Sequence, residues 1–150
     1  MEITAQHVKT LREKTGAGIA DVKKALEESE GDMDKAFALI ERKLGGAAIK
    51  KSTRTTGAGL VEAYIHSNSR IGVLIEVFCE TDFVARNPVF KEFSHDMALH
   101  IAAMEPADAE EFLAQPFVKD PNKTMREYLN EAIGRFGENI RIGRFVRFEI

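Results

Sequence analysis

One apolar stretch decides the fold of this chain: Ile71-Gly72-Val73-Leu74-Ile75-Glu76-Val77-Phe78-Cys79. A short apolar run rich in β-branched residues predicts a β-strand. Because nearly every residue in it is apolar, we expect it to be the central strand of a sheet and to be covered on both faces. Residues 60–66 form a second run of strand type, and Ser67-Asn68-Ser69-Arg70 between the two runs predicts a hairpin with a slightly long loop.

The end of the chain predicts a third strand. Apolar and charged side chains alternate over residues 140–150, which is typical of a half-buried antiparallel strand. On one face we expect Ile140, Ile142, Val146, Phe148 and Ile150, and on the other Arg141, Arg147 and Glu149.

Two helices are predicted between the second and third strands. Pro88 suits the first turn of a helix, and an apolar stripe at helical spacing follows it until Pro106 breaks the pattern. The connection over residues 105–123 is mixed and turn-rich. Thr124 and Glu127 then predict a capping box at the start of a second helix, which we expect to end at Gly137.

The N-terminal part predicts three short helices. Thr4 can cap the first, the second begins near Asp21, and Asp32 caps the third. We expect Gly45-Gly46 to end the third helix. Helices this short are unstable singly in water, so they must pack together as a small bundle.

The predicted fold class is therefore α+β, in three parts. Residues 1–45 form a three-helix module, and residues 46–59 form a linker or a loosely held helix. Residues 60–150 form a core in which a three-stranded antiparallel sheet packs with helices. The linker carries Lys50, Lys51 and Arg54 with no acidic residue, and such charge is more often plain solvation than a binding patch.

Composition excludes several classes of function. The net charge of −3 argues against a dedicated nucleic-acid binder, and no apolar run approaches the roughly 20 residues of a membrane helix. Cys79 is the single cysteine, and the first residues lack the basic and apolar regions of a secretory leader. We therefore expect a cytoplasmic protein with no direct contact to nucleic acid or membrane.

Catalytic chemistry finds little support in the residues. The four histidines lack zinc-ligand spacing, and there is no phosphate-binding loop or dinucleotide fingerprint. A Cys79–His66 hydrolase and a carboxylate pair among Glu76, Glu80 and Asp82 are conceivable, but a lone cysteine at a strand end is more often a small buried hydrophobe. We expect no catalytic residue, no metal site and no cofactor.

The segment Thr81-Asp82-Phe83-Val84 is the unusual feature, because a large aromatic stands beside an acid just after the central strand. In one interpretation Asp82 caps the next helix and Phe83 turns back into the core. In the other, Phe83 is exposed and anchors the chain in a partner's pocket, with the acid beside it for orientation.

Several segments in order resemble the elongation factor Ts family of translation nucleotide-exchange factors. They read Leu11-Arg12-Glu13-Lys14-Thr15-Gly16-Ala17-Gly18, Asp21-Val22-Lys23-Lys24-Ala25-Leu26, Glu76-Val77-Phe78-Cys79-Glu80-Thr81-Asp82-Phe83-Val84-Ala85-Arg86-Asn87, Gln115-Pro116-Phe117-Val118-Lys119-Asp120 and Gly137-Glu138-Asn139-Ile140. The resemblance covers nearly the whole chain.

The resemblance implies an exchange factor that promotes GDP release from the GTPase elongation factor Tu and does no covalent chemistry. The N-terminal helices would be a ubiquitin-associated-like module. Thr81 to Val84 would disturb the partner's magnesium site, with Phe83 as a wedge and Asp82 beside it. The implied partner-binding residues are Gly16, Ala17, Gly18, Val22, Lys23, Phe136 and Gly137.

The chain also departs from the family pattern. Longer members have two similar core halves, whereas this chain has one, and short members form homodimers. The resemblance therefore implies a homodimer, with His66 of one chain taking a second-half role. The connection between Met104 and Gln115 is also shorter than in other short members.

Two other classes of function compete with this one. A ubiquitin-associated-like adaptor would leave the 81–84 segment unexplained. An RNA-binding ribosome accessory protein would need base-stacking aromatics in the basic stretch, which has none.

Overall fold

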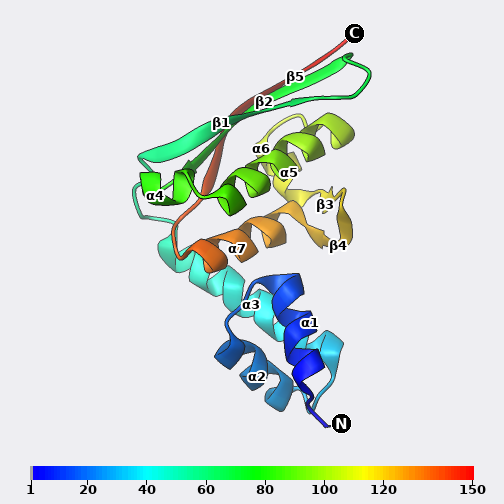
Figure 1. The fold of residues 1–150 in the computed structure, drawn as a ribbon, viewed down its shortest axis with the longest axis vertical. Coiled ribbons are helices and arrows are strands. Elements are labelled where there is room, and N and C mark those ends of the chain that lie inside the picture. Colours follow the sequence, from blue (N-terminus) through cyan, green and yellow to red (C-terminus); the bar gives the residue numbers. More distant parts are fainter. Residues whose placement is uncertain (1) are drawn as a thin grey trace.

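The computed structural model describes residues 2–150 and has the α+β architecture that the sequence predicts (Figure 1). Met1, the first residue of the predicted helical module, lies outside the described residues. The elements along the chain are α1 (Ala5–Thr15), α2 (Ile19–Glu28), α3 (Met33–Lys51), β1 (Ala58–Ile65), β2 (Ile71–Cys79), α4 (Asp82–Ala85), α5 (Pro88–Met104), α6 (Ala109–Ala114), β3 (Pro116–Phe117), β4 (Asp120–Thr124), α7 (Met125–Phe136) and β5 (Arg141–Glu149).

Helices α1, α2 and α3 pack together at one end of the molecule, as predicted (Figure 1). Thr4 caps α1 by accepting a hydrogen bond from the backbone N–H of His7, and Asp32 caps α3 by accepting two. The bundle has a small core of its own, made of Leu11, Ala17, Val22, Ala25, Leu26, Ala36 and Ile40.

Helix α3 does not end at Gly45-Gly46, so that prediction was wrong. The helix continues to Lys51 and enters the segment predicted as a linker or a loosely held helix. Its continuation rests on tertiary packing, because Ala48 is buried in the main core and Leu44 lies against α7, where a Cβ added at Gly134 would be 2.6 Å from Leu44 Cδ2. Glycine costs about 1 kcal/mol in a helix interior, and this packing offsets that cost.

The main sheet has the strand order β1-β2-β5, and both pairs are antiparallel. The central position of β2 is thus confirmed. Helices α5 and α7 lie on one side of the sheet, and none of the elements described above covers the other (Figure 1). Val73, Ile75 and Val77 face the helices and are buried, whereas Leu74 is 49% exposed on the open face. The expectation that β2 is covered on both faces was therefore wrong, because a single layer of helices packs on this sheet.

A β-bulge in β5 changes which face its side chains occupy. The register shifts between residues 75 and 77 of β2, so that residues 143 and 144 of β5 lie opposite Glu76 alone. The backbone N and the Nε of Arg144 each donate to Glu76 Oε1 at 2.8 Å, which holds the bulge in place. An additional residue of this kind reverses the alternation on its far side.

The bulge makes the predicted division of faces in this strand wrong. Ile142 and Phe145 pack against the main core on the helix-covered side. Arg147 shares that side, and its Nε donates to the carbonyl of Ala102. Val146 and Phe148 lie on the open face, opposite Leu74 and Gly72 in register.

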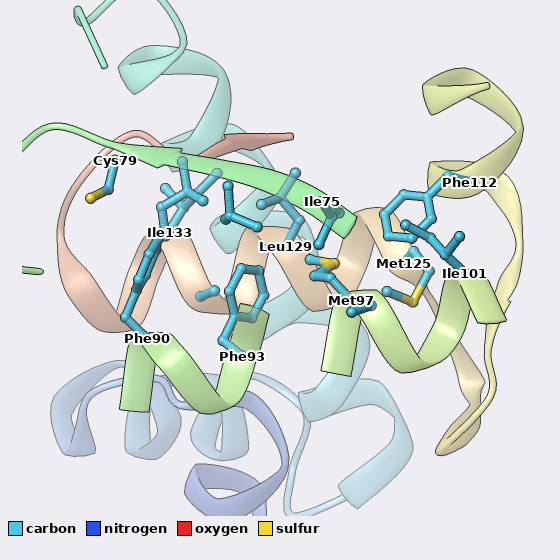
Figure 2. Close-up of a cluster of buried hydrophobic side chains, with 14 of the residues drawn as sticks. Ile75, Cys79, Phe90, Phe93, Met97, Ile101, Phe112, Met125, Leu129 and Ile133 are labelled. Carbon is cyan, nitrogen blue, oxygen red and sulfur yellow. The ribbon is translucent and has the colours of Figure 1, made fainter. Parts of the chain in front are cut away.

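The main core lies between β2, α5 and α7 (Figure 2). Phe90, Phe93, Met97 and Ile101 rise from α5 towards the strand, and Leu129 and Ile133 meet them from α7. Phe112 of α6 closes one end of this core.

The turn-rich connection contains more regular structure than the sequence predicts, namely α6 and the small β3–β4 hairpin. Buried His100 organises it, because its Nε2 lies 2.9 Å from Gln115 Oε1 and its Nδ1 accepts from the N–H of Val118. Burial lowers the pKa of His100, which favours the neutral ring that this pattern requires.

Candidate functional site

The short helix α4 presents Phe83 to solvent. Thr81 is its N-cap and accepts a hydrogen bond from the N–H of Val84 at 3.3 Å. Val84 is buried against the main core, so its neighbour on the single helical turn points away, and the Phe83 side chain is 84% exposed. The interpretation in which Asp82 is the cap and Phe83 turns into the core was therefore wrong.

Contacts from distant parts of the chain hold the base of α4. The Oε1 of Glu138 accepts from the N–H groups of Glu80 and Thr81, at 3.0 and 3.1 Å. The Thr81 hydroxyl donates to Glu138 Oε2 at 2.7 Å. Arg54, from the segment after α3, places its Nη1 3.7 Å from Glu80 Oε2 and 3.4 Å from the carbonyl of Gly137.

The end of α7 adjoins α4 through these contacts. Gly137 has a φ of 70°, and its N–H donates to the carbonyl of Ile133, which ends the helix in the left-handed conformation favoured by glycine. Phe136 is half-buried, with its ring 5.7 Å from the ring of Phe90 in an edge contact. The structure thus brings residues 136–137 and residues 81–84 together.

The turn of residues 16–18 lies beside the same helix. Gly16 has a φ of 70°, and a Cβ added there would be 2.9 Å from Nε of Arg135. Of the predicted partner-binding residues in this region, Gly18 and Lys23 are exposed, whereas Ala17 and Val22 are buried in the helical module. Ile19, which the sequence did not single out, is 50% exposed between them.

His66 lies away from this site, at the other end of the hairpin. Strand β1, which has eight residues and separates His66 from the α4 end of the sheet, spans about 25 Å. The Nδ1 of His66 lies 3.0 Å from the hydroxyl oxygen of Tyr64. Within one chain, the structure does not bring His66 to residues 81–84.

The candidate enzyme sites do not assemble. The Cys79 thiol is buried and donates to the carbonyl of Thr81, its pKa is raised by burial, and it lies at the opposite end of the hairpin from His66. Among the three acids of the conceivable carboxylate pair, Glu76 is bonded to Arg144 on the open sheet face. Hydrogen bonds from Arg144 lower the pKa of Glu76 to about 2.

Residues 2–150 contain neither a metal-binding cluster nor a membrane-spanning helix. The described histidines, cysteine and acids form no group of three suited to hold a metal ion. Among the helices described above, none combines the length and the apolar character that crossing a bilayer requires.

Sequence comparisons identify the family. Residues 80–150 match the family model described as Elongation factor TS. The chain is 43% identical to Elongation factor Ts of Rubrobacter xylanophilus, with the whole of both chains covered. The chain belongs to the elongation factor Ts family. The resemblance drawn from the sequence segments is thereby confirmed, and the chain is a translation elongation factor of this family.

Other elongation factor Ts proteins cover nearly the whole chain. The relative from Carboxydothermus hydrogenoformans is 43% identical over 99% of this chain and 89% of its own length. The relative from Trichlorobacter lovleyi is 47% identical over 99% of this chain, which corresponds to 48% of the relative. The alignment with the Rubrobacter protein spans 195 positions, whereas this chain has 150 residues. The Rubrobacter protein therefore contains residues that this chain lacks.

Glu138 and Arg54 are the residues of this site that sequence reasoning missed. The sequence places Glu138 in a family-like segment without indicating a role, and it places Arg54 in a linker or loosely held helix whose charge is explained by solvation. Neither has a local signal, since each meets its partners across more than 20 residues of chain.

Proposed function

We propose that this elongation factor Ts is the guanine-nucleotide exchange factor of elongation factor Tu, and that Phe83 is its principal contact with the GTPase. One observation supports this assignment above the others: a large aromatic side chain that is 84% exposed on a turn anchored from both sides. Aromatic anchors of this kind dominate protein interfaces when they enter a partner's pocket.

The proposed mechanism is mechanical. Phe83 enters between helices of the GTPase, and exposed Asp82 and Thr81 beside it displace the elements that hold magnesium. Buried Val84 supports the turn from within. Bound GDP depends on magnesium and on a phosphate-binding loop, so disturbing them weakens nucleotide binding. By thermodynamic linkage nucleotide weakens binding of the factor equally, so GTP entry releases it. No covalent bond forms or breaks on this chain.

A second contact is proposed around the 16–18 turn and the end of α7. Exposed Gly18 and Lys23 would touch the GTPase, whereas buried Ala17 and Val22 would hold the shape of that surface. Gly16 packs beside Arg135, so this surface and the 136–137 turn lie on neighbouring parts of one face. Phe136 and Gly137 would then meet the GTPase next to Phe83.

We further propose that the chain forms a homodimer and acts in the cytoplasm, and the open face of the sheet supports the dimer. Val61, Leu74, Val146 and Phe148 are all at least 40% exposed on it, and exposed apolar patches of this kind mark interfaces. Two such sheets can pack face to face about 10 Å apart. The partner copy would bring its own His66 to the assembly, in the role that the resemblance implies.

Release of labelled GDP from elongation factor Tu tests the proposed function. We expect the intact chain to accelerate release and Phe83→Ala to reduce that acceleration at least about tenfold, because hot-spot truncations cost 2 kcal/mol or more. Ile49→Ala is the matched control, since Ile49 is also an exposed hydrophobic residue, at 75%, on a different element. Equal activity of Phe83→Ala and the intact chain would refute the assignment.

A further inference from the structure

The carboxylate of Glu138 holds the two residues that lead into α4. Thr81 is the N-cap of this four-residue helix and Glu80 precedes it, so the N–H groups of both lack a partner inside the helix. Glu138 accepts from the N–H groups of Glu80 and Thr81 and from the Thr81 hydroxyl, with donor–acceptor distances between 2.7 and 3.1 Å. Hydrogen bonds to a charged acceptor are about twice as strong as neutral ones.

These three bonds join two stretches of chain that are more than 50 residues apart. Glu138 directly follows Gly137, whose left-handed conformation turns the chain at the end of α7. Glu138 is therefore adjacent in sequence to one proposed contact segment, residues 136–137. Its side chain is hydrogen-bonded to the base of the other, residues 81–84.

We call the three hydrogen bonds of Glu138 to Glu80 and Thr81 the clamp. The segment that follows α3 holds the clamp in turn. The Nδ2 of Asn139 donates to the carbonyl of Arg54 at 2.9 Å. The Arg54 guanidinium reaches back to Glu80 and to the Gly137 carbonyl. Because α3 runs from the helical module to this point, the module, the end of α7 and α4 share one hydrogen-bonded junction.

We propose that Glu138 is a positioning residue for nucleotide exchange. It fixes the orientation of α4 and of Phe83 relative to the 136–137 turn, so that both segments meet the GTPase in one step. This inference rests on the proposed function. Glu138 need not touch the partner or the nucleotide: it acts by reducing the ordering that α4 would otherwise undergo on binding.

The test compares three variants at this position with a control. Glu138→Ala removes all three bonds. Glu138→Gln keeps an oxygen that can accept from both N–H groups, whereas Glu138→Asp keeps the charge but is one methylene shorter. Glu110→Ala, an exposed acid on α6, is the control for loss of one negative charge.

Two readouts separate the inference from the proposed function. Amide hydrogen exchange of Glu80 and Thr81 in the isolated protein reports the clamp directly. GDP release from elongation factor Tu reports its consequence. We expect Glu138→Ala and Glu138→Asp to speed amide exchange and to reduce GDP release about tenfold, the effect of losing a charged hydrogen bond. Glu138→Gln should stay within about threefold of the intact chain in both readouts.

The inference is overturned if Glu138→Ala loosens the two amides while GDP release stays normal, or if the amides remain protected. It is also overturned if Glu138→Gln protects the amides yet loses activity, since charge and not position would then matter. If Glu138→Ala does not fold, the Gln and Asp variants decide by the same criteria. Normal release by Phe83→Ala would instead refute the proposed function, whatever the Glu138 variants do.

Discussion

The ammonium nitrogen of Lys123 lies 2.9 Å from both carboxylate oxygens of Glu131, and both side chains are buried. The same nitrogen donates to the carbonyl of Lys14 at the end of α1. Glu41 of α3 faces this pair, with both of its carboxyl oxygens buried beside the Glu131 carboxylate. A small polar cluster therefore joins the helical module to the core.

Glu41 makes the stability of the protein depend on pH. Burial, and then the neighbouring Glu131, raise the pKa of Glu41 from 4.5 to about 9, with Glu127 adding to the rise and Lys123 opposing it. The folded chain thus keeps a proton that the unfolded chain releases, so this group lowers the free energy of unfolding as pH rises from about 5 to about 9. We expect Glu41→Gln to match the intact chain at pH 5 and to be more stable by about 1–2 kcal/mol at pH 8, after allowance for solvent screening of a half-buried group.

Urea unfolding at several pH values measures this difference. Glu92→Gln, a change at an exposed acid of α5, should follow the intact chain throughout. A Glu41→Gln curve parallel to that of the intact chain between pH 5 and pH 8 would contradict the proposed protonation.

Gly46 offers a stabilising substitution. It lies inside α3, and a Cβ added there would meet nothing within 4 Å. We expect Gly46→Ala to raise the free energy of unfolding by about 0.5–1 kcal/mol, because alanine loses less conformational freedom in a helix. Gly137→Ala is the opposite control: it also meets open space, but its φ of 70° disfavours alanine and should make the protein less stable. Destabilisation by Gly46→Ala in thermal or urea unfolding would argue that α3 ends at the glycine pair.

Gly143 is required by the bulge of β5. A Cβ there would overlap the ring of Phe78 and lie 2.9 Å from Cβ of Glu76. We expect Gly143→Ala to lower the free energy of unfolding by about 1–3 kcal/mol, the usual cost of overpacking. Gly57→Ala, where a Cβ would meet nothing within 4 Å, should change it little. If both variants unfold at the urea concentration of the intact chain, the bulge does not constrain this position.

Leu74 tests the proposed dimer, because it lies at the middle of the open sheet face and is 49% exposed. A lysine there would be buried without a partner between two packed sheets. We expect Leu74→Lys to be monomeric in sedimentation experiments at concentrations where the intact chain is dimeric. Ile49→Lys makes the same change on α3 and should leave the dimer intact. An intact chain that sediments as a monomer would rule out the dimer altogether.

Local signals were sufficient for much of the fold. Thr4 and Asp32 are caps as predicted, Pro88 is in the first turn of α5, and the hairpin strands lie close to their predicted positions. Each of these signals depends on residues within a few positions of one another, which is the range over which propensity and periodicity act.

The candidate site was predicted in part. The sequence marks the 81–84 segment as unusual because an aromatic stands beside an acid. It does not show which of Phe83 and Val84 is buried in the core. In the structure Val84 is buried in the core and Phe83 is exposed to solvent. The hydrogen bonds of Glu138 had no local signal, because its partners are more than 50 residues away.

The sequence by itself determined the family, the order of the major elements and the central place of β2, because these follow from local pattern and from long matching segments. Only the tertiary structure decided that α3 passes through Gly45-Gly46, that the β5 bulge reverses the alternation of faces, and that Glu138 holds α4. The reason is physical: each of these outcomes depends on the packing or hydrogen bonding of groups far apart in the chain, and its free energy exceeds the local preference that the sequence expresses.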